Sequence, residues 1–126
     1  MATPLVLVAE DDPDLCDLLQ MTLEHQGAEV VTVSNGTEVV PACRARRPDL
    51  LLLDLSLEGR HGIDVLRDLR ADEALSSLPV LVVTGHGRES GVDEAMAAGA
   101  TDWLGKPFTP TDLTLRVTLL LSQVAS

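Results

Sequence analysis

The segment Arg47–Gly62, RPDLLLLDLSLEGRHG, holds the most apolar run of the chain, Leu50–Leu53, and Asp54 closes that run. Four consecutive leucines without a polar residue are typical of a strand buried on both faces, as in a parallel sheet. A carboxylate that directly follows such a strand lies at the carboxyl end of the sheet, where open α/β folds place their sites. The segment therefore predicts a parallel sheet and singles out Asp54 as a candidate reactive group.

Similar apolar runs alternate with amphipathic stretches along the rest of the chain. We expect strands at Leu5–Ala9, Val30–Val33, Leu50–Leu53, Val80–Val83 and Trp103-Leu104. We expect helices at Asp14–Gln26, Thr37–Arg47, Ile63–Ala71, Glu89–Ala98 and Thr109–Val124. This alternation predicts an α/β fold, a three-layer sandwich built on a five-stranded parallel sheet. No linker or repeat interrupts it, so residues 1–126 are expected to form one domain.

Some residues of these helices carry expectations of their own. Leu15 and Leu18 recur at helical spacing in the first helix, which places them on its apolar stripe. Pro41 falls early in the second, where a first turn tolerates it. In the last helix Leu115 and Leu119 fall opposite the inward stripe, so we expect them to be exposed. Single exposed leucines are ordinary, but two on successive turns also suit contact with a protein partner or a second copy.

The composition excludes several classes of function. The chain has 20 acidic and nine basic residues, a formal net charge of −11, and its basic residues are scattered. This charge repels phosphate-rich polymers, and only Trp103 and Phe108 are aromatic, so direct nucleic-acid binding is not expected. No stretch approaches the roughly 18 apolar residues of a membrane span, and we find no export signal. Cys16 and Cys43 have no metal-ligand spacing, which fits a cytoplasmic protein with reduced thiols.

Polar residues follow four of the expected strands. Glu10 and Asp11 follow the first, Asp54 the third, Thr84 the fourth and Lys106 the fifth. The carboxyl ends of parallel strands meet at one edge of the sheet, so we expect these side chains to converge. Clustered carboxylates repel one another unless they share a cation, and their oxygens suit Mg²⁺. A lone ammonium and a hydroxyl suit phosphoryl oxygens, so the pattern predicts a phosphoryl group carried on a carboxylate, with Asp54 as nucleophile.

The segments around these residues resemble a response-regulator receiver domain of two-component signalling, of the chemotaxis-regulator type. The matching segments are LVLVAEDDPDL (Leu5–Leu15), RPDLLLLDLSLEGRHG (Arg47–Gly62), LPVLVVTGHG (Leu78–Gly87) and AGATDWLGKPF (Ala98–Phe108). Four motifs in order, each at a strand end, make the resemblance specific, and it spans almost the whole chain. It implies a flavodoxin-like fold with strand order 2-1-3-4-5 and five helices.

The resemblance implies a role for each acid of the cluster. Asp54 would accept the phosphoryl group. Asp11 would be the nearer Mg²⁺ ligand, and Glu10 would act largely through metal-bound water. The backbone carbonyl of Ser56 would be a further ligand, while Asp12 would be a bystander or weak helper.

The resemblance also assigns the conformational switch. Thr84 would be the switch hydroxyl, and Lys106 would pair with the phosphate before a cis peptide bond to Pro107. Trp103 falls on the switch aromatic, where the family usually has Tyr or Phe. Because an indole is bulkier, we expect it to turn inward less readily than those rings.

Three positions depart from the family pattern or carry two interpretations. Glu58 and His61 stand where Pro and Asp are typical, which would alter partner contact more than chemistry. His86 lies two residues after Thr84, at a position that influences dephosphorylation in the family. His86 would either hold or exclude the attacking water, or be an ordinary exposed loop histidine. The exposed loop histidine is also the default interpretation of His61.

These observations favour a phosphorylation-dependent signalling switch, not a general enzyme. It would take a phosphoryl group from a phosphohistidine of a histidine kinase or phosphotransfer protein, with Mg²⁺. Its output would pass through the face of the fourth helix, fifth strand and fifth helix, to a protein partner or in a homodimer. One alternative is a degenerate receiver that binds partners without phosphorylation. A related hydrolase would need an acid at Ser56. A stand-alone receiver and one excised from a longer regulator both fit, with the initial Met slightly favouring the first.

Overall fold

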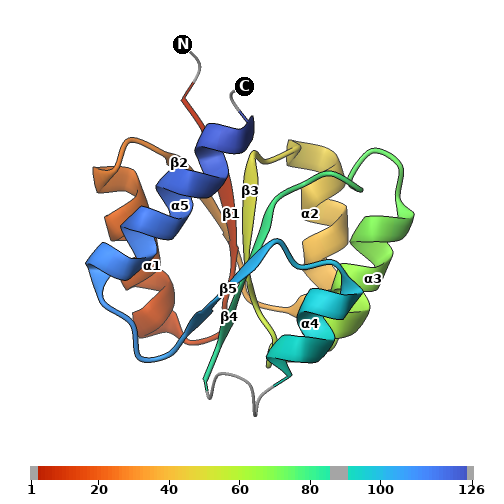
Figure 1. Ribbon diagram of the computed structural model, residues 1–126. Coiled ribbons are helices and arrows are strands. Elements are labelled where there is room, and N and C mark those ends of the chain that lie inside the picture. Colours follow the sequence, from red (N-terminus) through yellow and green to blue (C-terminus); the bar gives the residue numbers. More distant parts are fainter. Residues whose placement is uncertain (1–2, 86–90, 125–126) are drawn as a thin grey trace.

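The sheet predicted from the sequence forms with the expected strand order. The computed structural model describes residues 3–85 and 91–124. All five strands are parallel and follow the order β2-β1-β3-β4-β5 (Figure 1). The strands are β1 (Leu5–Ala9), β2 (Glu29–Val33), β3 (Leu50–Asp54), β4 (Val80–Thr84) and β5 (Asp102–Gly105). The expected α/β architecture is therefore confirmed.

Helices cover both faces of the sheet and complete three layers. They are α1 (Pro13–His25), α2 (Val39–Arg46), α3 (Gly62–Ala71), α4 (Val92–Ala98) and α5 (Pro110–Val124), with a short 3₁₀ turn, η1 (Gly36–Glu38), before α2. Helices α1 and α5 pack on one face, and α2, α3 and α4 on the other (Figure 1). Each helix between two strands returns the chain to the start of the next parallel strand, as in other folds of this kind.

The leucine run of β3 divides its side chains between the two cores. Leu51 and Leu53 point toward α2 and α3, while Leu50 and Leu52 point toward α1 and α5. All four are fully buried. Burying a leucine contributes about 1.5–3 kcal/mol, so this strand anchors the fold and fixes where its carboxyl end lies.

The register of the sheet brings the polar strand ends to one level. Ala9 pairs with Leu53 across β1 and β3, so Glu10 and Asp54 come next on neighbouring strands. Thr84 pairs with Gly105 across β4 and β5, immediately before Lys106. The sequence expectation that these side chains share one edge of the sheet is therefore correct.

Helices α2 and α4 differ most from their expected bounds. The expected helix Thr37–Arg47 is split into η1 and α2, which puts Pro41 in the first turn of α2. A first-turn N–H has no intrahelical partner, so the proline costs no hydrogen bond there. Helix α4 begins at Val92, directly after Gly91, whose φ of +93° does not continue a right-handed helix. The expected start at Glu89 lies outside the described residues.

The expectation for Leu18 is wrong. Leu19 and Leu23 form the buried centre of the α1 stripe, and Leu18 on its flank is 46% exposed. Cys16 is half-buried and Cys43 is buried, and both thiols are free. Within residues 3–85 and 91–124, we find no helix long and apolar enough to cross a membrane.

Candidate functional site

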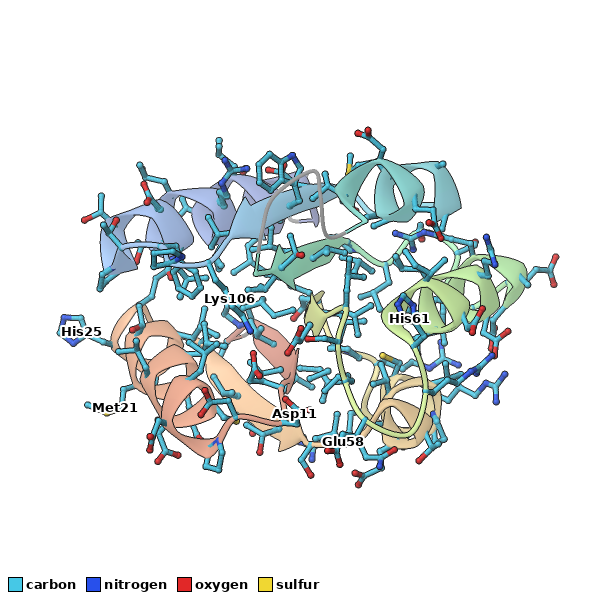
Figure 2. The ribbon with its side chains drawn as sticks, turned by 90° about the horizontal axis from the view of Figure 1, so that it is seen from below. Asp11, Met21, His25, Glu58, His61 and Lys106 are labelled. Carbon is cyan, nitrogen blue, oxygen red and sulfur yellow. The ribbon has the colours of Figure 1, made fainter. Side chains whose placement is uncertain are left out.

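Three carboxylates gather at the carboxyl edge of the sheet. Oxygens of Glu10, Asp11 and Asp54 all lie within 4.8 Å of one another. Glu10 and Asp54 are each only 3% exposed, and Asp11 is more accessible. Figure 2 looks onto this edge and shows Asp11 and Lys106 there. Strands β1 and β3 thus hold two buried carboxylates beside a third that faces solvent.

Lys106 supplies a positive charge at this cluster. Its Nζ atom lies 3.2 Å from Glu10 Oε1 and 3.4 Å from Asp54 Oδ2. Its backbone N–H donates to the Thr84 carbonyl at 2.7 Å, which fixes the end of β5 against β4. Burial alone would lower the pKa of Lys106, but the Asp54 and Glu10 carboxylates outweigh burial and raise that pKa. The ammonium is therefore charged when it meets the carboxylates.

One ammonium does not balance three carboxylates, and Glu10 shows the imbalance. Burial, with the nearby Asp54 carboxylate adding to it, raises the pKa of Glu10 to about 7. The Asp12 N–H, which donates to Glu10 Oε2 at 3.1 Å, acts in the opposite direction. A group of hard oxygen donors with surplus negative charge fits a small divalent cation. The cluster therefore has the composition of a metal site.

Asp12 has a structural role that the bystander interpretation missed. It is the N-cap of α1, where its Oδ1 atom accepts from the N–H groups of Asp14 at 3.0 Å and Leu15 at 3.4 Å. Such caps contribute about 1 kcal/mol to helix stability. Asp12 thus fixes the start of α1 while its own N–H orients Glu10.

Ser56 contacts the Asp54 carboxylate through two donors. The Ser56 N–H and hydroxyl donate to Asp54 Oδ1 at 3.0 Å and 2.9 Å. Asp54 Oδ2 faces Lys106, so the two oxygens of this carboxylate have different partners. The sequence interpretation considered only the Ser56 carbonyl, because a hydroxyl two residues after an acid gives no signal of its own. The loop after β3 therefore orients Asp54 through a side chain as well as the backbone.

The residues assigned to the switch lie at the same edge or next to it. Thr84 is buried at the end of β4. Trp103 is half-buried on β5 and packs against the core on the α4 side of the sheet. The peptide bond between Lys106 and Pro107 is cis, as the family resemblance implied.

The histidines lie in different places from one another. His61 is exposed but is not a free loop residue, because its Nδ1 accepts from the Ile63 N–H at 3.2 Å and caps α3. Glu58 contributes its backbone carbonyl, which accepts from the Gly36 N–H at 2.8 Å. Figure 2 shows both Glu58 and His61 near the carboxyl edge. His86 lies outside the described residues.

Four of the five exposed large apolar side chains among the described residues lie on α1 and α5, which form one layer. Leu115 and Leu119 of α5 are 60% and 63% exposed, as expected. Met21 of α1 is 68% exposed and points away from the molecule in Figure 2. With Leu18, Met21 lines a shallow hollow between α1 and α5. The sequence analysis missed this second patch because it placed Leu18 in the core.

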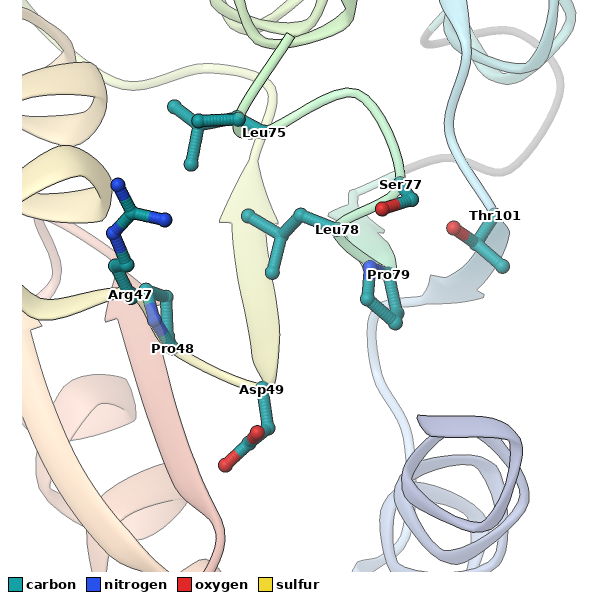
Figure 3. Close-up of a pocket in the computed structure, with 9 residues that line it drawn as sticks. Arg47, Pro48, Asp49, Leu75, Ser77, Leu78, Pro79 and Thr101 are labelled. Atoms are coloured by element: carbon teal, nitrogen blue, oxygen red, sulfur yellow. The ribbon is translucent and has the colours of Figure 1, made fainter. Parts of the chain in front are cut away.

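A separate hollow of about 460 Å³ opens at the amino end of the sheet, on the side away from the carboxylates (Figure 3). Asp49 and Thr101 line it, but Asp49 Oδ2 accepts from the Leu5 N–H at 2.8 Å and Thr101 Oγ1 from the Val80 N–H at 3.0 Å. These polar groups serve the backbone, so the hollow does not compete with the carboxyl edge as a candidate site.

The fold and the clustered acids define a receiver domain. The family model of the response regulator receiver domain matches residues 6–118, and the chain belongs to that family. It is 40% identical over 112 residues to the DNA-binding response regulator MtrA of Mycolicibacterium smegmatis, a match that covers 89% of this chain and 48% of MtrA. It is 39% identical over 118 residues to the phosphate regulon transcriptional regulatory protein PhoB of Rhizobium meliloti, covering 94% of this chain and 52% of PhoB. The chain thus spans about half the length of these curated relatives.

Solved structures show the same fold. The chemotaxis response regulator CheY4 of Vibrio cholerae superposes with a TM-score of 0.89 at 26% identity, covering 94% of this chain and 99% of CheY4. The signal receiver domain of a histidine kinase from Syntrophus aciditrophicus superposes with a TM-score of 0.88 at 31% identity. This match covers 97% of this chain and 92% of the receiver domain. The chain is therefore similar to a chemotaxis response regulator and to the receiver domain of a histidine kinase.

Proposed function

We propose that residues 1–126 act as one phosphorylation-dependent switch in which Asp54 accepts a phosphoryl group from a phosphohistidine. The observation that carries this proposal is the buried Asp54 carboxylate with Lys106 Nζ 3.4 Å from its Oδ2 atom and two further acids beside it. An ordinary surface acid would be exposed and without such partners. The donor would be a histidine kinase or a histidine phosphotransfer protein.

The transfer is a substitution at phosphorus. An oxygen of Asp54 forms the new P–O bond while the P–N bond of phosphohistidine breaks, and the leaving imidazole nitrogen keeps the electron pair and takes a proton from solvent. The Lys106 ammonium would then donate to a phosphoryl oxygen in place of its present contact with Asp54, and the Thr84 hydroxyl lies at the neighbouring strand end. Positioned charges of this kind are the main source of catalysis in phosphoryl transfer.

We propose Mg²⁺ as the cofactor. Asp11 and Asp54 would bind it directly with the Ser56 carbonyl, and Glu10 would act through a bound water, which suits an ion that keeps several waters. The bound ion would neutralise charge on the transferring phosphoryl group. The raised pKa of Glu10 supports this proposal because it reflects a site with too little positive charge.

The output is a changed surface for a protein partner or for a second copy of the chain. Leu115 and Leu119 on α5 would belong to that surface, together with α4 and β5. The relatives MtrA and PhoB are named for DNA binding or transcriptional regulation, but this chain matches about half of each. With a net charge of −11 the receiver itself does not suit direct contact with DNA. The two free cysteines fit the reducing environment of the cytoplasm.

Trp103 permits a direct test because it is the single tryptophan of the chain. Its emission is measured as the protein is titrated with Mg²⁺ and then with beryllofluoride, a mimic of the phosphoryl group. We expect a saturable response in wild type and its loss in Asp54→Asn. No response in wild type, or an equal response in Asp54→Asn, would contradict the proposal and favour a receiver that binds partners without phosphorylation.

A further inference from the structure

The outer edge of β5 is joined to α5 through Asp102. One oxygen of this carboxylate accepts from the Trp103 N–H at 2.8 Å, and the other pairs with Arg116 Nη1 at 2.9 Å. Strand β5 lies at the edge of the sheet, where backbone donors lack a neighbouring strand. Asp102 therefore satisfies an edge donor and at the same time orients the guanidinium of Arg116.

Arg116 in turn covers the indole of Trp103. The guanidinium carbon lies over the ring at 6.0 Å from the centroid, within the range of a cation–π contact. On its inner side Trp103 packs against the core on the α4 side of the sheet. The ring is thus held between the core and an arginine that a second residue keeps in place.

Gly105 sets where the indole lies along the strand. A methyl group built on Gly105 would lie 3.4 Å from Trp103 Cζ3, so the six-membered ring extends along β5 toward this glycine. Gly105 is the register partner of Thr84. A branched side chain at residue 105 would occupy the volume that the indole uses, whereas a single methyl makes only an ordinary contact.

We propose that Gly105 and Arg116 are positioning residues for Trp103. Gly105 leaves room for the indole to lie along β5, and Arg116, oriented by Asp102, holds the ring against the core. The indole is then not too bulky for the switch position, because the glycine two residues later compensates for its size. The inference that the ring is released on phosphorylation rests on the proposed function. The packing of the ring against Gly105 and Arg116 does not depend on that function.

The expected effect is moderate. The Arg116–Asp102 pair is partly exposed, and ion pairs and cation–π contacts at such positions each contribute little. Removing Arg116 should make beryllofluoride bind about three- to tenfold more tightly, because the restraint on the resting arrangement is lost. Asp102→Asn keeps an acceptor for the Trp103 N–H but loses the charge, so it should give a smaller change in the same direction.

The first experiment compares wild type, Arg116→Ala and Arg67→Ala without any phosphoryl analogue. Arg67 lies on α3 in an exposed pair with Asp64, so its variant matches the loss of charge away from Trp103. Acrylamide quenching of Trp103 should increase about twofold or more in Arg116→Ala and stay at the wild-type value in Arg67→Ala. Equal quenching in all three proteins would overturn the role of Arg116.

The second experiment tests Gly105. Gly105→Ala should keep the wild-type emission maximum and quenching, whereas Gly105→Val should shift the emission and increase quenching while circular dichroism shows an intact fold. Wild-type emission in Gly105→Val would overturn the role of this glycine.

A beryllofluoride titration of the Arg116 variants then separates the two proposals. Tighter beryllofluoride binding in Arg116→Ala, and not in Arg67→Ala, supports the proposal that Arg116 restrains Trp103. Unchanged binding refutes it. No response in any protein would contradict the proposed function while leaving the quenching result to decide the packing.

Discussion

Replacing Glu10 by glutamine removes a buried carboxyl group whose pKa the fold raises to about 7 from an ordinary value of 4.5. The amide keeps nearly the same shape, and its oxygen still accepts from the Asp12 N–H. In the absence of a divalent cation this variant should be more stable than wild type above neutral pH. The reason is that the folded protein no longer has to ionise Glu10 beside Asp54.

The direction and size of this difference in stability follow from the raised pKa of Glu10. Between pH 4.5 and 7 the folded protein keeps the Glu10 proton while the unfolded chain releases it, so rising pH favours unfolding. A difference of about 2.5 units at 1.36 kcal/mol each gives a loss of about 3 kcal/mol in the free energy of unfolding, fully present above pH 7. The pKa of about 7 already includes the attraction of the Lys106 ammonium, which lowers it. We therefore expect Glu10→Gln to be about 1–3 kcal/mol more stable than wild type at pH 8 and nearly equal to it at pH 4.5.

The assay is urea unfolding at pH 4.5 and pH 8 with a chelator present. Glu73→Gln is the matched control, because Glu73 is an exposed acid in the loop after α3 and its replacement removes the same charge. The control should show no comparable gain. The reasoning would be refuted if the difference in free energy of unfolding between Glu10→Gln and wild type were the same at pH 4.5 and pH 8. Adding Mg²⁺ at pH 8 should stabilise wild type more than the variant.

Three further changes test other parts of the site and surface. Lys106→Met keeps the aliphatic stem but removes the ammonium that lies 3.4 Å from Asp54 Oδ2. Phosphorylation by a small donor such as phosphoramidate, measured by intact mass, should therefore slow about tenfold or more. An unchanged rate would show that the ammonium does not assist transfer. Ser56→Ala removes one donor from Asp54 Oδ1, which should lower the free energy of unfolding by about 1 kcal/mol or less. The rate of phosphorylation should rise because this oxygen becomes a better nucleophile. A slower rate of phosphorylation would contradict this reasoning. Leu119→Glu should weaken self-association or partner binding without loss of stability, since the side chain is 63% exposed; an unchanged mass in solution and unchanged binding would count against this surface.

The strands and the convergence of their ends could be predicted because they depend on local patterns. A run such as Leu50–Leu53 has few structural solutions, and parallel pairing then requires that Asp54 and Lys106 lie at one edge. The pattern also placed the carboxyl end of each strand within one residue of its position in the structure, which is what the site depends on. The family resemblance added roles that geometry alone does not assign.

Other features could not be predicted because they depend on contacts between distant parts of the chain. Arg116 meets Trp103 and Asp102 only when α5 lies beside β5, and neither spacing nor residue type indicates this contact. Leu18 satisfied the helical period but lies on the flank of α1, because the packing direction of a helix is set by its neighbours. His61 caps α3 through a hydrogen bond that another residue type at that position would make equally well.

The central claim is that Asp54 carries the phosphoryl group, and intact mass with peptide mapping tests it most directly. Wild type and Asp54→Asn are incubated with phosphoramidate, each with Mg²⁺ and with chelator. We predict that wild type with Mg²⁺ gains the mass of one phosphoryl group, that the group maps to the peptide containing Asp54, and that Asp54→Asn gains none there. Chelator should abolish the gain. A wild-type protein that gains no mass, or a variant that is modified to the same extent, would contradict the account.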